Sequence, residues 1–296
     1  MKSRIVLVTG ATSGIGRHTA LDLARAGHRV FATGRRVDAL ESLRQQAEKE
    51  GLSIDTLALD VTKPSSIEQA RVAIEQATNG YGVDAVINNA GYGLVGPVES
   101  IGDEALRAQY ETNVFGLLGV TRAFLPAMRQ RGSGRIVNVS SIGGRITFPM
   151  MGVYNSTKYA VESLSDALRV ELRPFGVGVS LIEPGAIRTE FADVAMSTVA
   201  HDPSSPYAGA TADADAMRKK FEATMVGPEY VTRAIRKAVE SRRPRARYVT
   251  PRSAGVAIWL FKLLPTSWSD ALLGQMSGLT RQKLVGDGSA KLSLAS

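Results

Sequence analysis

Two side chains that could move a proton stand four positions apart in the sequence, Tyr154 and Lys158. On a helix they would share one face, because residues at this spacing are neighbours across one turn. A nearby ammonium favours the phenolate and lowers the pKa of a tyrosine from its ordinary value of about 10. We therefore predict that Tyr154 donates and accepts a proton near neutral pH, with Lys158 as its tuning partner.

A hydroxyl group that could orient a carbonyl oxygen precedes this pair, at Ser141. It follows an apolar run at 135–139 that predicts a buried strand. In sheets of parallel strands, ligands bind at the carboxyl ends of the strands. Ser141 is therefore expected to donate a hydrogen bond to the substrate oxygen that Tyr154 protonates. A tyrosine and a lysine at this spacing are a weak indication alone, and the position of Ser141 strengthens it.

A glycine-rich turn that could hold a phosphate spans residues 9–16, between an apolar run at 5–8 and a predicted helix. Glycines let the backbone approach a pyrophosphate, and a helix N-terminus offers free N–H groups and a partial positive charge. The spacing differs from the general Gly-x-Gly-x-x-Gly fingerprint, and a tight turn without a ligand is the alternative. The residues expected to bind the phosphates are Gly10, Thr12, Ser13, Gly14, Ile15 and Gly16.

The general fingerprint does occur elsewhere, at Gly91, Gly93 and Gly96. Pro97 and the residues after it separate these glycines from the next predicted helix, so no helix N-terminus would face a phosphate there. We interpret this segment as a pliable wall of the active-site cleft.

The carboxyl end of the second predicted strand carries Arg35 and Arg36 and no acidic residue. An acid at this place usually binds the free ribose 2′-hydroxyl of NAD, whereas an arginine suits the 2′-phosphate of NADP. The predicted cofactor is therefore NADP(H). The alternative is that both arginines are only the solvated start of the helix predicted at 37–50.

Strands and helices alternate along most of the chain, which implies right-handed βαβ crossovers. We predict an α/β fold, a doubly wound parallel seven-stranded sheet with helices on both faces. The predicted strands cover residues 5–8, 30–33, 54–59, 83–87, 135–139, 177–182 and 248–250. The predicted helices follow the glycine-rich turn and then cover 37–50, 65–79, 103–131, 153–175 and 229–241. A capping box at 65–69 is expected to open the helix that ends near residue 79.

Two stretches interrupt this alternation. Residues 189–226 lack a strand and are expected to form a substrate lid, because structureless loops of this length are uncommon and usually functional. Residues 253–296 are expected to form a helical C-terminal extension with a mobile tail, which leaves 1–252 as the catalytic domain. The extension includes an apolar segment at 256–264, for which three roles are open: a cover over the substrate cleft, a contact with a membrane surface, or a subunit contact. We favour the cover over the cleft, because it would exclude water from the reaction.

Composition excludes several kinds of protein. The 296 residues include no cysteine, which rules out a disulfide framework, a thiol nucleophile and a cysteine-ligated metal, and no metal is expected. There is no secretory signal pattern and no apolar run of about 18 residues, so the expected location is cytoplasmic, with membrane association open. The net charge of +8 includes arginines at 242–252, interpreted as a solvated face or a strand edge or, alternatively, as a contact with phosphates or lipid headgroups. No nucleic-acid partner is expected.

Together these residues resemble the short-chain dehydrogenase/reductase family over roughly residues 3–250, and the resemblance implies a Rossmann fold. Several motifs occur in the family's order and spacing, which makes the match highly specific. They are the glycine-rich turn, Asp60-Val61, Asn88-Asn89-Ala90-Gly91, Asn113, Ser141, Tyr154-x-x-x-Lys158 and Pro184-Gly185-Ala186-Ile187-x-Thr189.

The resemblance implies a role for each of these positions. Asn113, Ser141, Tyr154 and Lys158 would be catalytic, with Asn113 holding a water in the proton relay and Lys158 also binding the nicotinamide ribose. Asn88 would brace the sheet. Asp60 and Val61 would flank the adenine, and Ile187 and Thr189 would bind the carboxamide. The remaining cofactor-binding positions would be Asn89, Ala90 and Gly91, with Pro184 and Gly185.

Hydride transfer between a nicotinamide ring and a carbinol carbon is the activity that the resemblance implies. Residues 183–190 and the extension are similar to those of 17β-hydroxysteroid and retinol dehydrogenases, which suggests a lipophilic alcohol, ketone or aldehyde, such as a steroid, a retinoid or a long-chain compound. The family also suggests a homodimer or homotetramer. Alternatives are a reductase of 3-oxoacyl thioesters or small carbonyls, and a catalytically silent NADP-binding sensor, which we would expect to lack Tyr154 or Lys158. A protein that uses its basic patch on nucleic acid or a membrane is a further alternative.

Overall fold

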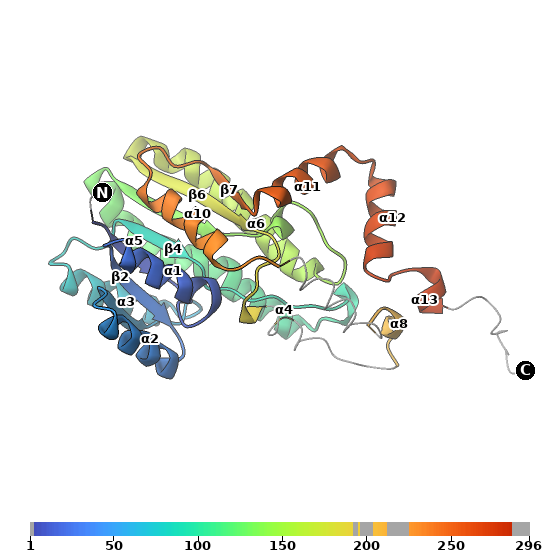
Figure 1. The fold of residues 1–296 in the computed structure, drawn as a ribbon, viewed down its shortest axis with the longest axis horizontal. Helices are drawn as coiled ribbons and strands as arrows, with labels where there is room; N and C mark the ends of the chain where they lie inside the picture. Colours follow the sequence, from blue (N-terminus) through green and yellow to red (C-terminus); the bar gives the residue numbers. More distant parts are fainter. Residues whose placement is uncertain (1–2, 192–194, 196–203, 212–224, 286–296) are drawn as a thin grey trace, which may run out of the picture.

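A computed structural model describes residues 3–191, 195, 204–211 and 225–285. Its centre is a parallel sheet of seven strands in the order β3-β2-β1-β4-β5-β6-β7 (Figure 1). The strands are Ile5–Val8 (β1), Arg29–Gly34 (β2), Ile54–Ala58 (β3), Ala85–Asn88 (β4), Gly134–Val139 (β5), Val177–Pro184 (β6) and Arg247–Thr250 (β7). The predicted seven-stranded doubly wound sheet is confirmed.

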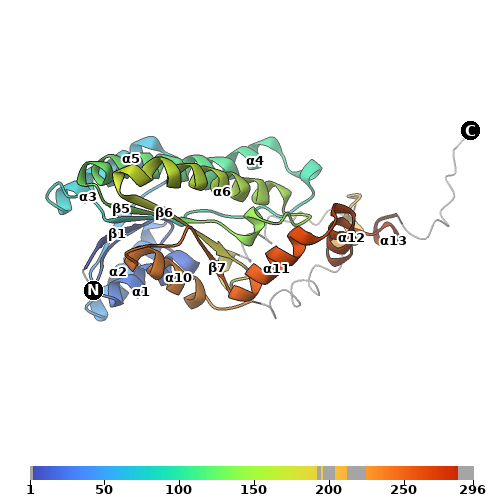
Figure 2. The same ribbon diagram turned by 90° about the horizontal axis from the view of Figure 1, so that it is seen from above.

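Helices cover both faces of the sheet, as Figure 2 shows from above. Three of them, α1, α2 and α10, lie on one face, and α3, α4, α5 and α6 lie on the other (Figure 2). The bounds are Gly14–Arg25 (α1), Val37–Lys49 (α2), Pro64–Ala77 (α3), Asp103–Tyr110 (α4), Leu117–Arg131 (α5), Gly152–Leu172 (α6) and Glu229–Glu240 (α10). Short 3₁₀ turns occur at Val98–Ser100 (η1), Ile142–Gly144 (η3) and Arg173–Phe175 (η4).

Alternating side chains of the central strands fill two cores, one on each face. In β1, Val6 and Val8 pack with α1 and α10, whereas Leu7 packs with α3 and α5 on the opposite face. All three side chains have no exposed surface. This is why the strand is an uninterrupted apolar run: both faces of a parallel sheet are covered by helices.

The strand register brings the predicted motifs to one edge of the sheet. Val8 of β1 is paired with Ile87 of β4, and Val139 of β5 with Ile182 of β6. The residues that follow these strands, at 9–16, 88–91, 140–141 and 184–189, therefore leave the sheet at the same carboxyl-terminal edge. Ligands of doubly wound sheets bind at this edge.

The prediction of one continuous helix at 103–131 is wrong. A π-helical turn, Glu111–Gly116 (η2), separates α4 from α5. The side chain of Asn113 lies in this turn and makes two hydrogen bonds with the backbone of Tyr92, accepting from the N–H at 3.1 Å and donating to the carbonyl at 2.9 Å. The wider π-helical turn thus positions Asn113. Such turns within helices frequently occur at functional sites.

The capping box predicted at 65–69 is also wrong. Helix α3 begins one residue earlier, with Pro64 at its first turn, and its N-cap Lys63 makes no side-chain capping bond. The hydroxyl of Ser66 instead accepts a hydrogen bond from the Asp60 N–H at 3.0 Å. Proline suits this first position because its missing N–H would be unpaired there anyway.

The C-terminal extension is helical within residues 252–285, as predicted. Its helices are Arg252–Leu263 (α11), Thr266–Met276 (α12) and Arg281–Val285 (α13). They lead away from the sheet, and α13 returns to contact α8 (Ala208–Thr211), a short helix of the predicted lid (Figure 1). The rest of the lid between 192 and 224, apart from residue 195 and 204–211, and the predicted tail at 286–296 lie outside the described residues. None of the described helices is both long and apolar enough to cross a lipid bilayer.

Candidate active site

The first turns of α6 carry Tyr154 and Lys158, both 6% exposed. The Nζ atom of Lys158 donates a hydrogen bond to the carbonyl oxygen of Val139 at 2.9 Å, which ties α6 to the carboxyl end of β5. The same nitrogen lies 5.7 Å from the centre of the Tyr154 ring. The structure thus brings the predicted tyrosine and lysine together on one helical face.

Ser141 is the N-cap of the 3₁₀ turn η3 and lies two residues after the end of β5. Its Oγ accepts a hydrogen bond from the Gly143 N–H at 3.0 Å and lies 3.5 Å from the carbonyl oxygen of Pro184. The hydroxyl also hydrogen-bonds the phenol of Tyr154, which lowers the pKa of that tyrosine. Ser141 and Tyr154 therefore converge on one point, as a pair that polarises a carbonyl oxygen must.

The expectation that Lys158 lowers the pKa of Tyr154 is wrong for this structure. Burial raises the pKa of Tyr154 to about 12, and only the hydrogen bond from Ser141 opposes that effect. Burial also lowers the pKa of Lys158 to about 8, while the negative charge of Glu162 raises it. The physical reason is desolvation, which disfavours the charged form of each group.

Asn113 lies beside this group. Its Nδ2 also donates to the hydroxyl of Thr157 at 3.0 Å, so η2 is held against α6. Gly91 fits between the two: a Cβ there would lie 3.0 Å from Asn113 Oδ1 and 3.8 Å from Lys158 Nζ. The four residues predicted to be catalytic therefore come from η2, η3 and α6 to one site.

The glycine-rich turn is packed too closely for side chains. A Cβ on Gly16 would lie 2.1 Å from the carbonyl oxygen of Gly10, and one on Gly10 would lie 2.9 Å from the Cα of Ala90. Gly10 also has a φ of +66°, which glycine adopts without strain. Ser13, at the N-cap of α1, makes no side-chain capping bond, so its hydroxyl leaves the first N–H groups of the helix to a ligand. The turn fits a pyrophosphate.

The two predicted cofactor regions, the turn and the end of β2, touch each other. Arg36 donates a hydrogen bond from Nη2 to the carbonyl oxygen of Thr12 at 3.2 Å. Arg35 is exposed and faces Asp60 from the neighbouring strand. Burial raises the pKa of Asp60, but hydrogen bonds from Thr62 and the charges of Arg35 and Lys63 outweigh it, so the pKa is lowered overall. Two guanidinium groups thus border the glycine-rich turn. Their charge suits a phosphate beyond the pyrophosphate, such as the 2′-phosphate of NADP.

The asparagines after β4 hold the turn and the sheet in place. Asn89 donates from Nδ2 to the carbonyl oxygens of Thr9 and Gly10, at 3.0 and 3.2 Å. Asn88 donates from Nδ2 to Asn138 Oδ1 at 2.8 Å, which braces β4 against β5 as the resemblance implied. The Ala90 N–H donates to the hydroxyl of Thr9 at 3.1 Å. This segment fixes the floor beneath the glycine-rich turn.

The loop after β6 closes over the same turn. Ile187 pairs with Val226 in an isolated parallel bridge, and Thr189 Cβ lies 3.3 Å from the place of a Cβ on Gly14. The Gly185 N–H donates to Thr250 at the end of β7 at 2.9 Å. Pro184, Gly185, Ile187 and Thr189 are thus at the cofactor edge. Val61, also in the predicted set, packs against Gly116 of η2 on the adenine side of the site that the resemblance implies.

Sequence reasoning missed Phe191 as a wall of the site. Its ring centre lies 5.5 Å from that of Tyr154, and its Cζ would lie 2.9 Å from a Cβ on Gly93. Gly93 therefore leaves room for Phe191, which agrees with the interpretation of the 91–96 segment as a cleft wall. An aromatic residue two positions after Thr189, at the start of the predicted lid, was the available indication.

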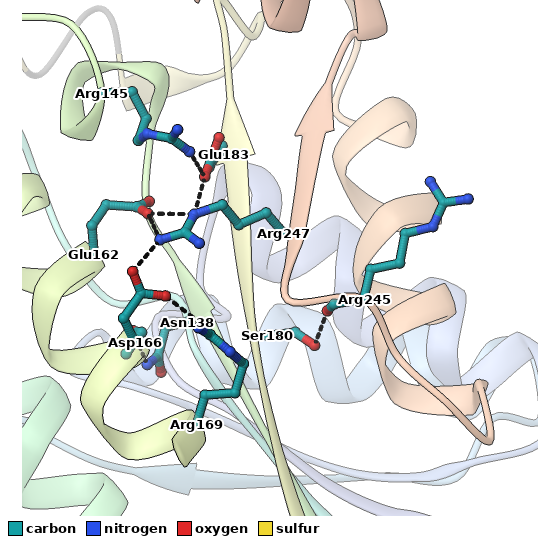
Figure 3. A network of polar contacts seen from close by, with 10 residues as sticks. Asn138, Arg145, Glu162, Asp166, Arg169, Ser180, Glu183, Arg245 and Arg247 are labelled. Atoms are coloured by element: carbon teal, nitrogen blue, oxygen red, sulfur yellow. Dashed lines mark hydrogen bonds and ion pairs between the residues drawn. The ribbon is translucent and has the colours of Figure 1, made fainter. Parts of the chain in front are cut away.

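Sequence reasoning also missed a polar network that joins α6, β6 and β7, drawn in Figure 3. Arg247 of β7 pairs with Glu162 and Asp166 of α6 and with Glu183 of β6, and Arg145 pairs with Glu183 (Figure 3). Arg247 lies on the edge strand of the sheet, as one interpretation of the basic patch expected, but it is not simply solvated, because it pairs with three carboxylates. In the part of the chain that the structure describes, no cluster of histidine, aspartate and glutamate is arranged to hold a metal ion.

Fold and site together define a nucleotide-dependent oxidoreductase of the doubly wound class. The sequence model for the short chain dehydrogenases matches residues 4–199. The chain belongs to this family.

Three proteins illustrate the similarity. The chain is 36% identical over 248 residues to 3-ketodihydrosphingosine reductase of Bacteroides thetaiotaomicron, covering 83% of this chain and 87% of the relative. It is 40% identical over 205 residues to human 17-beta-hydroxysteroid dehydrogenase type 1, covering 67% of this chain and 61% of the relative. A solved structure of serine dehydrogenase with NADP⁺ is 30% identical with a TM-score of 0.72, covering 84% of this chain and 95% of that chain.

Proposed function

We propose that the protein is an NADP(H)-dependent oxidoreductase that interconverts a lipophilic alcohol and its ketone or aldehyde. The observation that carries this proposal is the convergence of Ser141, Tyr154 and Lys158 at the carboxyl edge of the sheet, beside the glycine-rich turn. A catalytically silent sensor would have no use for this arrangement. When bound, the dinucleotide supplies or accepts the hydride, and the chain supplies the proton and the geometry.

Each side chain has a defined task in reduction. Ser141 donates a hydrogen bond to the carbonyl oxygen and fixes its position. Tyr154, whose pKa of about 12 keeps it protonated at neutral pH, passes its proton to the same oxygen while the carbonyl carbon gains the hydride. Lys158 supplies a positive charge beside the developing phenolate. Asn113 holds η2 against α6 through its hydrogen bond to the hydroxyl of Thr157. Oxidation is the reverse of these steps.

NADP(H) is supported by the pair of guanidinium groups at the end of β2 and by the absence of an acid there. Arg36 reaches the backbone of the phosphate turn and Arg35 stays exposed beside it, so one anchors the loop while the other is available to a 2′-phosphate. The NADP⁺ complex of serine dehydrogenase supports the same choice by analogy.

A lipophilic substrate is supported by the surroundings of Tyr154. Phe191 lies against the tyrosine ring, and Gly93 and Ala195 complete an apolar wall. The two named relatives act, by their names, on a ketone of a long-chain base and on a steroid. We infer that a bulky apolar ketone or alcohol fits this site better than a small polar one.

The extension supports a peripheral contact with a membrane. Its helices expose apolar side chains that a monomer in water would normally bury, among them Val256, Trp259 and Leu263 on α11 and Trp268 on α12. Residues 252–285 carry four basic side chains and one acidic, which suits an anionic lipid surface. We propose that the enzyme works in the cytoplasm at such a surface, as a homodimer or homotetramer.

The deciding experiment is a substrate screen with the purified full-length chain. NADPH oxidation would be followed with steroid ketones, long-chain 3-keto bases, 3-oxoacyl thioesters and small aldehydes, and NADP⁺ reduction with the matching alcohols. The Tyr154→Phe variant is the control for each substrate. Turnover of an apolar ketone or alcohol that disappears in the variant supports the proposal. NADPH binding without turnover of any compound would indicate the silent sensor instead.

A further inference from the structure

Ionisable side chains recur every four positions along the inner face of α6: Tyr154, Lys158, Glu162 and Asp166. Residues four apart are neighbours on a helix, so Glu162 is the nearest helical neighbour of Lys158 on the side away from Tyr154. Its side chain is 7% exposed, whereas that of Asp166 is 41% exposed. The mechanism so far gives Glu162 no task, although a buried carboxylate is costly to maintain.

Glu162 is fixed against the strand end that carries the catalytic serine. A Cβ on Gly144 would lie 3.0 Å from Glu162 Cγ, from the carbonyl oxygen of Lys158 and from Ser140 Oγ. Gly144 is thus the contact point of η3 and α6. The absence of a side chain at Gly144 lets Glu162 pack closely against η3.

A second buried carboxylate faces the first. Glu183, with no exposed surface, accepts on Oε1 from Arg145 at 2.9 Å and from Arg247 at 3.0 Å. Arg247 also pairs with Glu162 at 3.1 Å and with Asp166 at 2.6 Å, so one guanidinium is shared by three acids (Figure 3). The other oxygen of Glu183 is buried and has no hydrogen-bond partner among the described residues.

The charge of Glu162 therefore depends on its neighbours from every packed element. Burial raises the pKa of Glu162, the charge of Glu183 raises it further, and Ser140 and Arg247 lower it. Glu162 in turn raises the pKa of Lys158, which burial lowers to about 8. The carbonyl oxygen of Val139, which accepts the hydrogen bond of Lys158, and the side chains of Tyr154 and Asn113 also lie beside the lysine. Arg145 reaches Glu183 from the end of η3.

We propose that Glu162 and Glu183 form a carboxylate pair that sets the charge of Lys158: Glu162 holds the lysine as an ammonium, and Glu183 together with Arg247 decides how far Glu162 is ionised. Both glutamates are positioning residues, because neither reaches the reacting atoms. The proposal rests on the proposed function of Lys158. It explains why one partly exposed arginine is shared among three acids next to a lysine that must stay charged.

The test uses two isosteric substitutions with opposite expected effects. Glu162→Gln removes the negative charge that raises the pKa of Lys158, so the lysine should lose its proton at lower pH. The alkaline limb of kcat/KM for NADPH should therefore move to lower pH by about one unit. Glu183→Gln removes a repulsion on Glu162, so the same limb should move to higher pH. Asp166→Asn is the matched control: it also loses a bond to Arg247 but is half exposed and two turns from Lys158, so the limb should stay in place.

A second readout does not require activity. Because the folded-state pKa of Lys158 is depressed, stability rises as the pH increases from the folded to the unfolded pKa. In Glu162→Gln this rise should begin at a pH about one unit lower, as measured by denaturant unfolding between pH 6 and 10. If the wild type has no activity but Glu162→Gln still shows this shift, the proposed function is wrong and the proposal of the carboxylate pair stands.

If the alkaline limb moves in the same direction in Glu162→Gln and Glu183→Gln, the proposal is wrong. A purely structural role of the two glutamates does not predict shifts in opposite directions. If Glu183→Gln does not fold, Glu162→Asp takes its place. The shorter side chain keeps the negative charge, so the alkaline limb should return most of the way from its position in Glu162→Gln to that of the wild type. An alkaline limb as low in Glu162→Asp as in Glu162→Gln would count against the proposal.

Discussion

The ammonium nitrogen of Lys158 lies 5.7 Å from the centre of the Tyr154 ring and donates its hydrogen bond, at 2.9 Å, to the carbonyl oxygen of Val139. The lysine is thus held by the end of β5, and its charge faces the ring of the tyrosine. Such a cation over an aromatic ring is weakly attractive. Because both side chains are buried, desolvation dominates their titration and moves the two pKa values in opposite directions.

This burial predicts a specific dependence of stability on pH. Below pH 8, Lys158 is protonated in both the folded and the unfolded chain. From about pH 8 to 10.5 the unfolded chain binds more protons at this site, so the stability rises with pH. Lys158→Met should therefore gain stability relative to the wild type below pH 8 and lose that advantage by pH 10.5. Denaturant unfolding at several pH values measures it, and Lys49→Met, at an exposed position, serves as the control.

Tyr154 should act in the opposite sense at higher pH. Its pKa is about 12 in the folded chain and 10.0 in the unfolded one, so between these values the unfolded chain has already lost its proton. Stability should fall over this range, and the fall should be smaller in Tyr154→Phe. A fall of the same size in the variant would show that the phenol is solvated.

The same variant tests the proton transfer. Tyr154→Phe keeps the ring and its contact with Phe191 but removes the phenol oxygen, so turnover should drop by about 10²–10⁴-fold or more. NADPH binding should remain near that of the wild type, because the lost interaction belongs to the transition state. Lys158→Ala should weaken both. Near-normal activity in Tyr154→Phe would refute the site.

Much of this site could be predicted because its features are local in sequence. The glycine-rich turn, the tyrosine–lysine spacing and the serine after β5 each follow from a short pattern, and the strand alternation brings them to one edge. The π-helical turn at Asn113 could not be predicted, since it depends on hydrogen bonds with the backbone of Tyr92, 21 residues away. The pairing of Arg247 with Glu162 joins residues 85 apart and has no local pattern.

Cofactor preference should depend on Arg35 more than on the fold. A charge-assisted hydrogen bond to a phosphate contributes about 1.5–3 kcal/mol, so Arg35→Ala should raise the Kd of NADPH by roughly tenfold to a hundredfold and leave that of NADH nearly unchanged. Arg36→Ala should weaken both cofactors, because it also removes the bond to the Thr12 carbonyl. Fluorescence titration of both cofactors measures this. A wild type that prefers NADH would contradict the proposal.

The close packing of the phosphate turn can be tested by one added methyl group. In Gly16→Ala the Cβ would lie 2.1 Å from the Gly10 carbonyl oxygen and 2.5 Å from Asn89 Nδ2, so the turn must open. Overpacking of this kind costs about 1–3 kcal/mol of stability, and dinucleotide binding should be lost with it. Gly102→Ala is the matched control, since nothing lies within 4 Å of its Cβ. Unfolding and NADPH titration of both variants decide the matter.

The extension allows the sharpest test of where the enzyme works. Trp259 and Leu263 lie four apart on α11 and are each 62% exposed, whereas Ile258 holds the opposite face with 6% exposure. Replacing both exposed residues by Gln should reduce flotation with phosphatidylserine vesicles by about tenfold or more, because burying a large apolar side chain in the membrane contributes about 1.5–3 kcal/mol. The stability of the folded protein should not change, because both side chains are exposed in it.

Val37→Gln is the control for that experiment, an apolar residue 67% exposed at the start of α2. Vesicles of phosphatidylcholine alone should bind the wild type more weakly, since Arg252 and Lys262 border the apolar face and attract anionic lipid. If the double variant binds vesicles normally but loses turnover of bulky ketones, α11 covers the substrate cleft. If it instead changes the elution volume in size exclusion, α11 is a subunit contact, and the membrane proposal is wrong.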